Sequence, residues 1–230
     1  MNQRLFNELI KEEKQHALGE KSNDLEKSRR VIEFPLKWKL SNVVTPYLQN
    51  DEQLLLMGND VKEEVEAVKH LSKVTVESEG TLSYNNDSFD VVLNKHELVD
   101  AKEISRLLME DGYFITEQVG GLNNCELNLW LNLEATEAST PSLRRTVNQL
   151  KEAGLTILEA KDDISLTRFY DVGAIVYYLK VNHWQFPNFT VEKYFDRLVA
   201  IQAIIEQQGY MDITRHRFLI VAQKIVLNEN

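Results

Sequence analysis

The chain has 230 residues, a net charge of −10 at pH 7 and 43% hydrophobic residues. Its length and apolar content allow one sizeable core, and the acidic balance argues against nucleic acid, whose phosphates attract clustered Lys and Arg. The single cysteine, Cys125, excludes an internal disulfide and fits a reducing compartment. No apolar run reaches the roughly 18 residues of a membrane span, and the N-terminus lacks the apolar core of a signal peptide, so we expect a cytoplasmic protein.

Residues 1–50 predict an N-terminal helical cap. Apolar residues at helical spacing indicate an amphipathic helix over 5–17, and the polar stretch 19–27 indicates a loop. A second, shorter helix is expected over 38–48, interrupted by Pro46.

Residues 51–170 and 211–230 predict the core of one α/β sheet. The run QLLLMG at 53–58 indicates a first strand, followed by a helix over 61–71 and a strand over 73–77. Only 31 residues separate Gly58 from Asp90. Because a βαβ unit needs about 30 residues, this spacing leaves room for one strand-and-helix unit.

The stretch 88–124 reads as strand, helix and strand, with a polar or glycine-rich exit after each strand. The strand at 89–93 shows no alternation, which indicates burial on both faces. A helix is expected over 101–109, stopped where Gly112 can adopt a positive φ, followed by a strand over 113–119. Ligands bind at the carboxyl ends of strands in α/β sheets. His96, at the first exit, is therefore a candidate general base or substrate hydrogen-bonding group, with capping of the next helix as the structural alternative.

Downstream, Thr140 as N-cap and Pro141 at the first helical position predict a helix that runs through 153 and ends at Gly154. Strands are expected over 155–160 and 217–225. Between them, 171–210 is an insertion rich in aromatic residues. Either these rings line a pocket or they pack extra helices onto the sheet, and we favour packing because aromatic residues are common in cores. The rings are Tyr177, Tyr178, Trp184, Phe186, Phe189, Tyr194 and Phe195.

The segments SFDVV, NKHE and YFITEQVGGLN, with the DG turn between them, resemble class I S-adenosylmethionine-dependent methyltransferases. They are similar to a bacterial group of uncharacterised small methyltransferases that carries NRHE and FITQQVGGLND at these places. Segments 34–38, 44–48, 167–174 and 216–220 extend the resemblance over most of the chain. It implies a single Rossmann-like domain over 1–230, with helices flanking the sheet and its last two strands forming an antiparallel pair at the edge. It also favours a helix over 126–135, where the alternating leucines alone indicate a strand.

The chain departs from this superfamily around the cofactor. The usual DxGxGxG-like loop is reduced to Gly58, followed by Asn59 and Asp60. One βα unit is missing where the family has two, and an aromatic GWDFS-like segment is replaced by GEKSN at 19–23. The missing unit ordinarily supplies the acidic residue that binds the ribose hydroxyls.

The resemblance implies S-adenosylmethionine as cofactor, and the acidic charge balance favours a small-molecule acceptor or a protein over nucleic acid. The resemblance places Gly58 and Asn59 at the methionine part of the cofactor, Ser78 and Glu79 at the adenine side, and Asn94 and His96 around the transferred methyl as catalytic candidates. The substrate-side candidates are Gln118, Gly121, Asn123, Arg168 and Tyr170. The histidines and Cys125 show no metal-ligand spacing, so no metal site is expected.

Three functions remain open at this point. The first is methyl transfer to an oxygen, nitrogen or carbon nucleophile, a reaction that depends mainly on alignment of the reactants. The second is a catalytically inactive methyltransferase homologue that acts as a binding or partner module, which the three losses around the cofactor favour. The third is a nucleotide-binding domain that uses the same crevice, because a fold does not determine a function.

Overall fold

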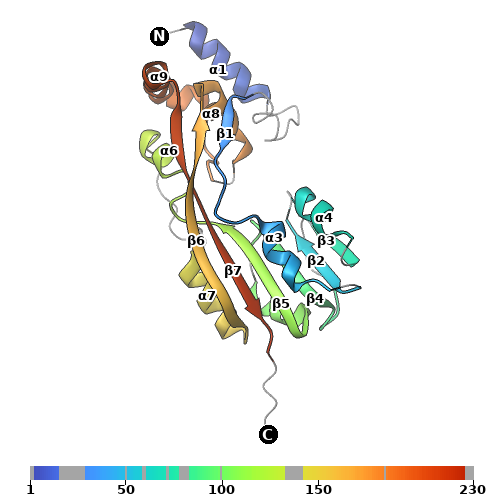
Figure 1. The fold of residues 1–230 in the computed structure, drawn as a ribbon. Coiled ribbons are helices and arrows are strands. Elements are labelled where there is room, and N and C mark those ends of the chain that lie inside the picture. Colours follow the sequence, from blue (N-terminus) through green and yellow to red (C-terminus); the bar gives the residue numbers. More distant parts are fainter. Residues whose placement is uncertain are drawn as a thin grey trace. The chain divides into compact units, whose positions relative to one another are not determined.

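The computed structural model describes residues 3–15, 29–49, 51–58, 61–70, 73–77, 83–98, 100–132, 142–183 and 185–225. Within them, seven strands form one mixed sheet in the order β1-β6-β7-β5-β4-β2-β3 (Figure 1). Strands β2 to β5 are parallel where they pair, whereas β7 runs antiparallel to β5 and β1 antiparallel to β6. The strands are β1 (Val31–Glu33), β2 (Gln53–Met57), β3 (Lys73–Glu77), β4 (Phe89–Lys95), β5 (Leu108–Val119), β6 (Thr156–Phe169) and β7 (Met211–Gln223). The predicted α/β class with an antiparallel last strand is confirmed.

The helices flank this sheet. They are α1 (Gln3–Gln15), α3 (Leu40–Val44), the 3-10 helix η2 (Thr45–Tyr47), α4 (Lys62–Val68), α5 (Ala101–Leu107), α6 (Cys125–Trp130), α7 (Leu143–Glu152), α8 (Val172–Val181) and α9 (Val191–Gln208). Helix α6 resolves the ambiguity of the alternating leucines. Leu127 and Leu131, one helical turn apart, are buried, whereas Leu129 is 79% exposed.

Contacts divide the chain into two compact units. The first comprises 1–35, 122–135 and 165–215, and the second comprises 36–121, 136–164 and 216–230. Strands β6 and β7 contribute residues to both. The predicted limits of a single domain, with its cap, sheet core and insertion, remain a prediction.

The core of the first unit is built by α1, α6, α8, α9 and the ends of β6 and β7. The aromatic side chains of the insertion that the structure describes lie in or against this core. Phe186, Phe189 and Phe195 are each at most 5% exposed. The packing interpretation of these rings is therefore confirmed, with Trp184 outside the described residues.

The second unit has a core on each face of the sheet. On one face, helices α3 and α4 cover apolar side chains that include Leu54, Leu93 and Ile115. On the other face, α5 and α7 cover a set that includes Val92, Phe114 and Phe218. Alternate residues of the central strands thus enter different cores, which explains the unbroken apolar run of β4.

One helix and one strand, α4 and β3, stand between β2 and β4 in the described part of the chain. This agrees with the single unit that the spacing predicts. The sheet still has seven strands because β1 pairs with β6, with Val31 opposite Phe169. The expectation that the last two strands form the sheet edge is therefore wrong, since β1 lies outside β6.

Two predicted helix boundaries are also wrong. Helix α5 ends at Leu107 and β5 begins at Leu108, with the positive φ of 61° at Asp111 rather than at Gly112. Gly112 is needed for another reason, since a Cβ there would lie 2.9 Å from the Met109 carbonyl oxygen. Helix α7 begins two residues later than predicted, with the Ser142 side chain as N-cap acceptor of the Arg145 amide.

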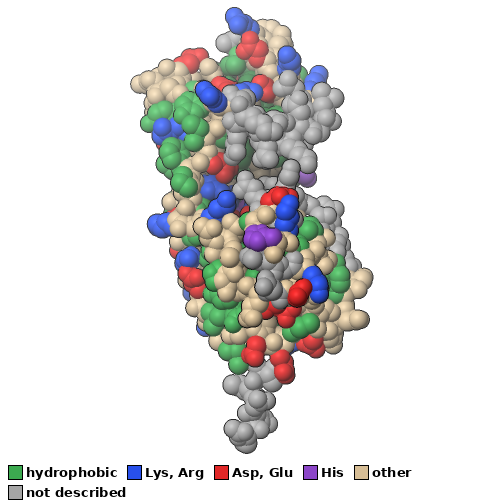
Figure 2. Space-filling model, turned by 45° about the vertical axis from the view of Figure 1, so that its right-hand side comes forward, with side chains coloured by type: hydrophobic (Ala, Val, Ile, Leu, Met, Phe, Trp, Pro, Cys, Tyr) green, Lys and Arg blue, Asp and Glu red, His purple; other side chains and the backbone are tan. Residues whose placement is uncertain are grey.

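Charge is dispersed over the face of the molecule that Figure 2 shows. On this face the described Lys and Arg side chains are interspersed with Asp and Glu rather than gathered in one patch. Among the helices of the described segments, none is long and apolar enough to cross a membrane.

Candidate functional site

The candidate site lies at the carboxyl ends of β4 and β5 in the second unit. The register of the two parallel strands places Asn94 beside Thr116 and Lys95 beside Glu117. His96 follows directly, and its amide donates to the Glu117 carbonyl at 3.0 Å. Strand ends of this kind are the usual ligand sites of α/β sheets.

Asn94 and Gln118 lie together on the face covered by α5 and α7. Asn94 is fully buried, and its Oδ1 accepts hydrogen bonds from Thr116 Oγ1 at 3.1 Å and from Gln118 Nε2. Gln118 also donates to the Glu97 carbonyl at 2.9 Å. The amide of Gln118 is thus engaged inside the protein, although the sequence predicts it on the substrate side.

Asn94 Nδ2 is the exception in this network. It is buried and has no hydrogen-bond partner among the residues that the structure describes. A buried amide donor without an acceptor costs about 1–3 kcal/mol, so such groups are rare in folded proteins. An acceptor atom supplied by a ligand would remove this cost.

His96 belongs to a different cluster, on the face covered by α3 and α4. Its Nε2 lies 3.4 Å from Glu117 Oε1, and the indole nitrogen of Trp38 donates to Glu117 Oε2 at 2.7 Å. Because side chains alternate along β5, Glu117 points away from Thr116 and Gln118. Asn94 and His96, which the sequence predicts at one site, therefore lie on opposite faces of the same sheet edge.

The surroundings of Glu117 and His96 determine the charge that each side chain carries at neutral pH. Burial alone would raise the pKa of Glu117, but the hydrogen bonds and charges of its partners lower it to about 2. Burial lowers the pKa of His96, and Arg217 and Lys95 act in the same direction, while Glu117 opposes them. At neutral pH the pair is an ionised carboxylate and a neutral imidazole.

The backbone at His96 is held in an unusual conformation. Its φ is +64°, in the left-handed region that costs an L-residue about 1–2 kcal/mol. Such conformations cluster at functional sites, where the surrounding structure imposes them.

The exit of β2 packs against the end of β4. Gly58 has a φ of +135°, and a Cβ there would lie 2.5 Å from the Lys95 carbonyl oxygen. The Lys95 ammonium lies 3.1 Å from Glu64 Oε1, with both side chains largely buried. These contacts lie where the strand order reverses between β2 and β4. Of the predicted cofactor residues, Asn59, Ser78 and Glu79 lie outside the described residues.

The remaining substrate-side candidates are distributed over both units. Gly121 is exposed in the second unit, whereas Asn123, Arg168 and Tyr170 belong to the first. Asn123 is buried, and its carbonyl accepts from Gln185 Nε2 at 3.2 Å. Tyr170 is 38% exposed.

Arg168 is already bound within its own unit. Its Nε and Nη2 each lie 2.7 Å from a carboxylate oxygen of Asp212, and its guanidinium lies 3.6 Å from the centre of the Tyr210 ring. These contacts give Arg168 a structural role, and its place on the substrate side stays a prediction.

Sequence reasoning missed Glu117 and Trp38. Glu117 is the buried acidic residue near the carboxyl end of β5, whereas Glu110 and Asp111 of the same strand are exposed, and its place beside apolar and amide-bearing residues could have singled it out. Trp38 lies 79 positions earlier, so only the folded chain brings the two together.

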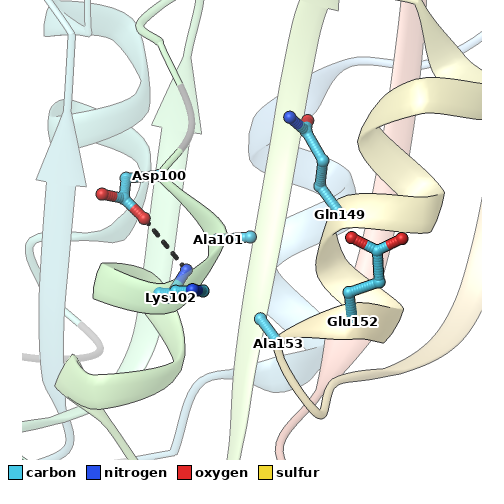
Figure 3. Close-up of a pocket in the computed structure, with 6 residues that line it drawn as sticks. All are labelled: Asp100, Ala101, Lys102, Gln149, Glu152 and Ala153. Atoms are coloured by element: carbon cyan, nitrogen blue, oxygen red, sulfur yellow. Dashed lines mark hydrogen bonds between the residues drawn. The ribbon is translucent and has the colours of Figure 1, made fainter.

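A pocket of about 450 Å³ lies between α5 and α7, away from the predicted residues (Figure 3). Figure 3 shows Gln149 and Glu152 on the α7 side, and the Asp100 side chain accepting from the Lys102 amide on the α5 side. None of the side chains at the strand ends described above lines this pocket.

Comparison with known family models gave no match, and no curated protein matches the sequence. The fold is similar to that of a candidate methyltransferase from Bacillus halodurans C-125, with a TM-score of 0.55 and 13% identity over 82% of this chain and 99% of that one. It is also similar to a candidate sarcosine dimethylglycine methyltransferase from Galdieria sulphuraria, with a TM-score of 0.47 and 13% identity over 81% and 83% of the two chains. A third similar structure is a Haloferax volcanii complex of the Trm112 methyltransferase activator with a candidate methyltransferase. Its TM-score is 0.47, with 13% identity over 91% of this chain and 95% of that one. The first of these establishes a methyltransferase-like fold for this chain.

Proposed function

We propose that this chain binds S-adenosylmethionine and transfers its methyl group to a small-molecule acceptor. The observation that carries the proposal is Asn94 Nδ2, a buried donor without a partner among the described residues, at the carboxyl end of β4 in a methyltransferase-like sheet. His96 and Glu117 stand at the same sheet edge.

The residues at this edge fit the cofactor. Asn94 offers a donor to an acceptor atom of the ligand, and Gly58 allows the exits of β2 and β4 to approach closely. Bound S-adenosylmethionine would supply a methyl group already activated by its sulfonium, so the protein has mainly to align the reactants. Contacts from Asn59, Ser78 and Glu79 remain part of the proposal, as does a role for Gly121, Asn123 and Tyr170 on the acceptor side.

A second candidate is an inactive homologue that acts as a binding or partner module. It is favoured by the single unit between β2 and β4 and by the Lys95–Glu64 ion pair, which occupies the point where the strand order reverses. Affinity for the cofactor is the first property that can separate the two candidates, and transfer of its methyl group is the second.

Calorimetric titration with S-adenosylmethionine and S-adenosylhomocysteine tests the proposal. Micromolar binding is the expected result, and no binding up to millimolar concentrations would eliminate methyl transfer in favour of the inactive module. Asn94→Leu, which removes the donor, should weaken binding about tenfold or more, as expected for loss of a hydrogen bond to a charged or strongly polar ligand.

Thr116→Val is the matched control. It removes one partner of Asn94 Oδ1 and retains Nδ2. Binding by this variant should stay within about threefold of the parent, a difference of less than 1 kcal/mol. Equal losses in both variants would show that the network matters only for packing.

A further inference from the structure

We infer that His96 is a proton acceptor held in place by Glu117 and Trp38, and that the methyl acceptor is therefore a hydroxyl compound. This inference rests on the proposed function and names the substrate class of the same site. Its starting point is a chain of three side chains. Trp38 lies two residues before α3, His96 directly follows β4, and Glu117 lies on β5.

Each oxygen of the Glu117 carboxylate faces a different donor. Trp38 Nε1 lies 2.7 Å from Oε2, and His96 Nε2 lies 3.4 Å from Oε1. An ionised carboxylate is an acceptor only, so the hydrogen of the neutral imidazole resides on Nε2. The lone pair is then on Nδ1, and no hydrogen bond or ion pair of Nδ1 is found among the described residues. The His96 side chain is 34% exposed, so part of the ring is accessible from solvent.

The charges around His96 suit a base. Arg217 and Lys95 disfavour the imidazolium, so the ring stays neutral near pH 7. Glu117 lies close enough to stabilise the imidazolium once a proton has arrived. At the third residue, Trp38, the Lys161 ammonium lies 5.5 Å from the centre of the indole ring. A histidine oriented by a carboxylate is a general arrangement for proton abstraction.

Trp38 is a positioning residue. The neighbouring Lys37 fastens this segment to β6, because its amide donates to Asp163 Oδ2 at 2.9 Å and its ammonium lies 2.7 Å from Oδ1. The indole is thereby held against Glu117, and Glu117 holds the imidazole.

The need for a base identifies the acceptor. As the acceptor oxygen bonds to the methyl carbon, the carbon–sulfur bond of the donor breaks with its electron pair on sulfur, and the O–H proton passes to His96 Nδ1. A neutral amine already offers a lone pair, and a thiol with a pKa of about 8.5 is partly ionised near neutral pH. An alcohol or phenol has the greatest need for a proton acceptor during the step.

Nitrogen-15 NMR of the histidine rings tests the inference without any substrate. In the parent protein, His96 should be the Nε2–H tautomer at neutral pH, with a pKa below its ordinary value. Glu117→Gln should lower that pKa further, because the charge that favours the imidazolium is gone. Trp38→Phe should raise it, because Glu117 loses a competing donor.

Trp130→Phe, in the first unit, is the matched control and should leave the His96 resonances unchanged. A hydrogen on Nδ1, a charged ring at neutral pH, or a His96 pKa unaffected by Glu117→Gln would overturn the inference. Cofactor binding by the same samples reports separately on the proposed function.

The substrate class is tested with methyl-carbon-13 S-adenosylmethionine and a bacterial metabolite extract. A labelled methyl ether that His96→Gln fails to produce supports the inference. Labelled N-methyl or S-methyl products overturn it, while absence of any labelled product counts against the proposed function itself.

Discussion

The imidazole of His216 occupies the space where Gly120 would carry a side chain. An ideal Cβ on Gly120 would lie 2.3 Å from His216 Nδ1. The Gly120 amide also donates to the His216 carbonyl at 2.9 Å, so the two residues are held together by backbone and ring. Gly120 is therefore a glycine because β7 approaches it closely.

Gly120→Ala should destabilise the protein by about 1–3 kcal/mol, the usual cost of an overpacked position. The measurement is urea-induced unfolding followed by circular dichroism. Combining the change with His216→Ala should recover most of the loss, since the clash needs both groups. An unchanged midpoint for Gly120→Ala alone would contradict this account.

Gly112→Ala and Asp111→Gly should behave differently. Alanine at 112 would bring a Cβ within 2.9 Å of the Met109 carbonyl oxygen, so we expect a loss of about 1–3 kcal/mol. Glycine at 111 relieves a positive φ but increases the freedom of the unfolded chain, so its effect should be less than about 1 kcal/mol. Thermal unfolding of both variants tests this order. A larger loss of stability for Asp111→Gly than for Gly112→Ala would contradict the role given to Gly112.

Arg30→Lys should destabilise the first unit by about 1–3 kcal/mol. The Arg30 guanidinium contacts both carboxylate oxygens of Asp171, at 2.9 and 2.6 Å, and also reaches Glu12 at 2.9 Å. A lysine cannot reproduce these paired contacts. Arg4→Lys, in the exposed pair with Glu8, is the control and should have almost no effect on unfolding.

Glu117→Gln should make stability less dependent on pH. The pKa of Glu117 is depressed to about 2 in the folded protein, so its contribution is fully present above its ordinary value of 4.5 and is lost as the pH falls toward 2. At neutral pH the parent should therefore exceed the variant by roughly 3 kcal/mol at most. Urea unfolding should show this gap narrowing between about pH 5 and about pH 3.

The equivalent exposed change, Glu110→Gln, serves as control and should show no such narrowing. A constant gap between parent and Glu117→Gln across this range would mean that Glu117 contributes through shape rather than charge.

The sequence predicts β2, β3 and β4 well because they are short runs, whereas β5, β6 and β7 are 12, 14 and 13 residues long and each extends well beyond its predicted strand at one end. The bounds of β3 are as predicted, β2 ends one residue before the end of the predicted run 53–58, and β4 extends two residues beyond its predicted end. The single unit between Gly58 and Asp90 follows from spacing alone. Helix ends are predicted less well, since Asp111 rather than a glycine adopts the left-handed turn.

The candidate site was predicted only in part, because its geometry depends on distant residues. Asn94 and His96 are two positions apart but contact different partners. Asn94 bonds to Thr116, whereas His96, with its positive φ, lies beside Glu117, which faces away from Thr116. Trp38 carries no local signal for Glu117. The pairing of Trp38 with Glu117 becomes apparent only when two things are known together, the register of β4 and β5 and the position of the residues that precede α3.

The division of the chain into interleaved segments has a consequence for folding. The core of the first unit contains Leu9 near one end of the chain and Ile213 near the other. The second unit likewise needs Phe218 and Ile220 beside Leu55. Neither core can be completed until β7 has packed in place. Long-range contacts of this kind form slowly and leave apolar surface exposed in the meantime.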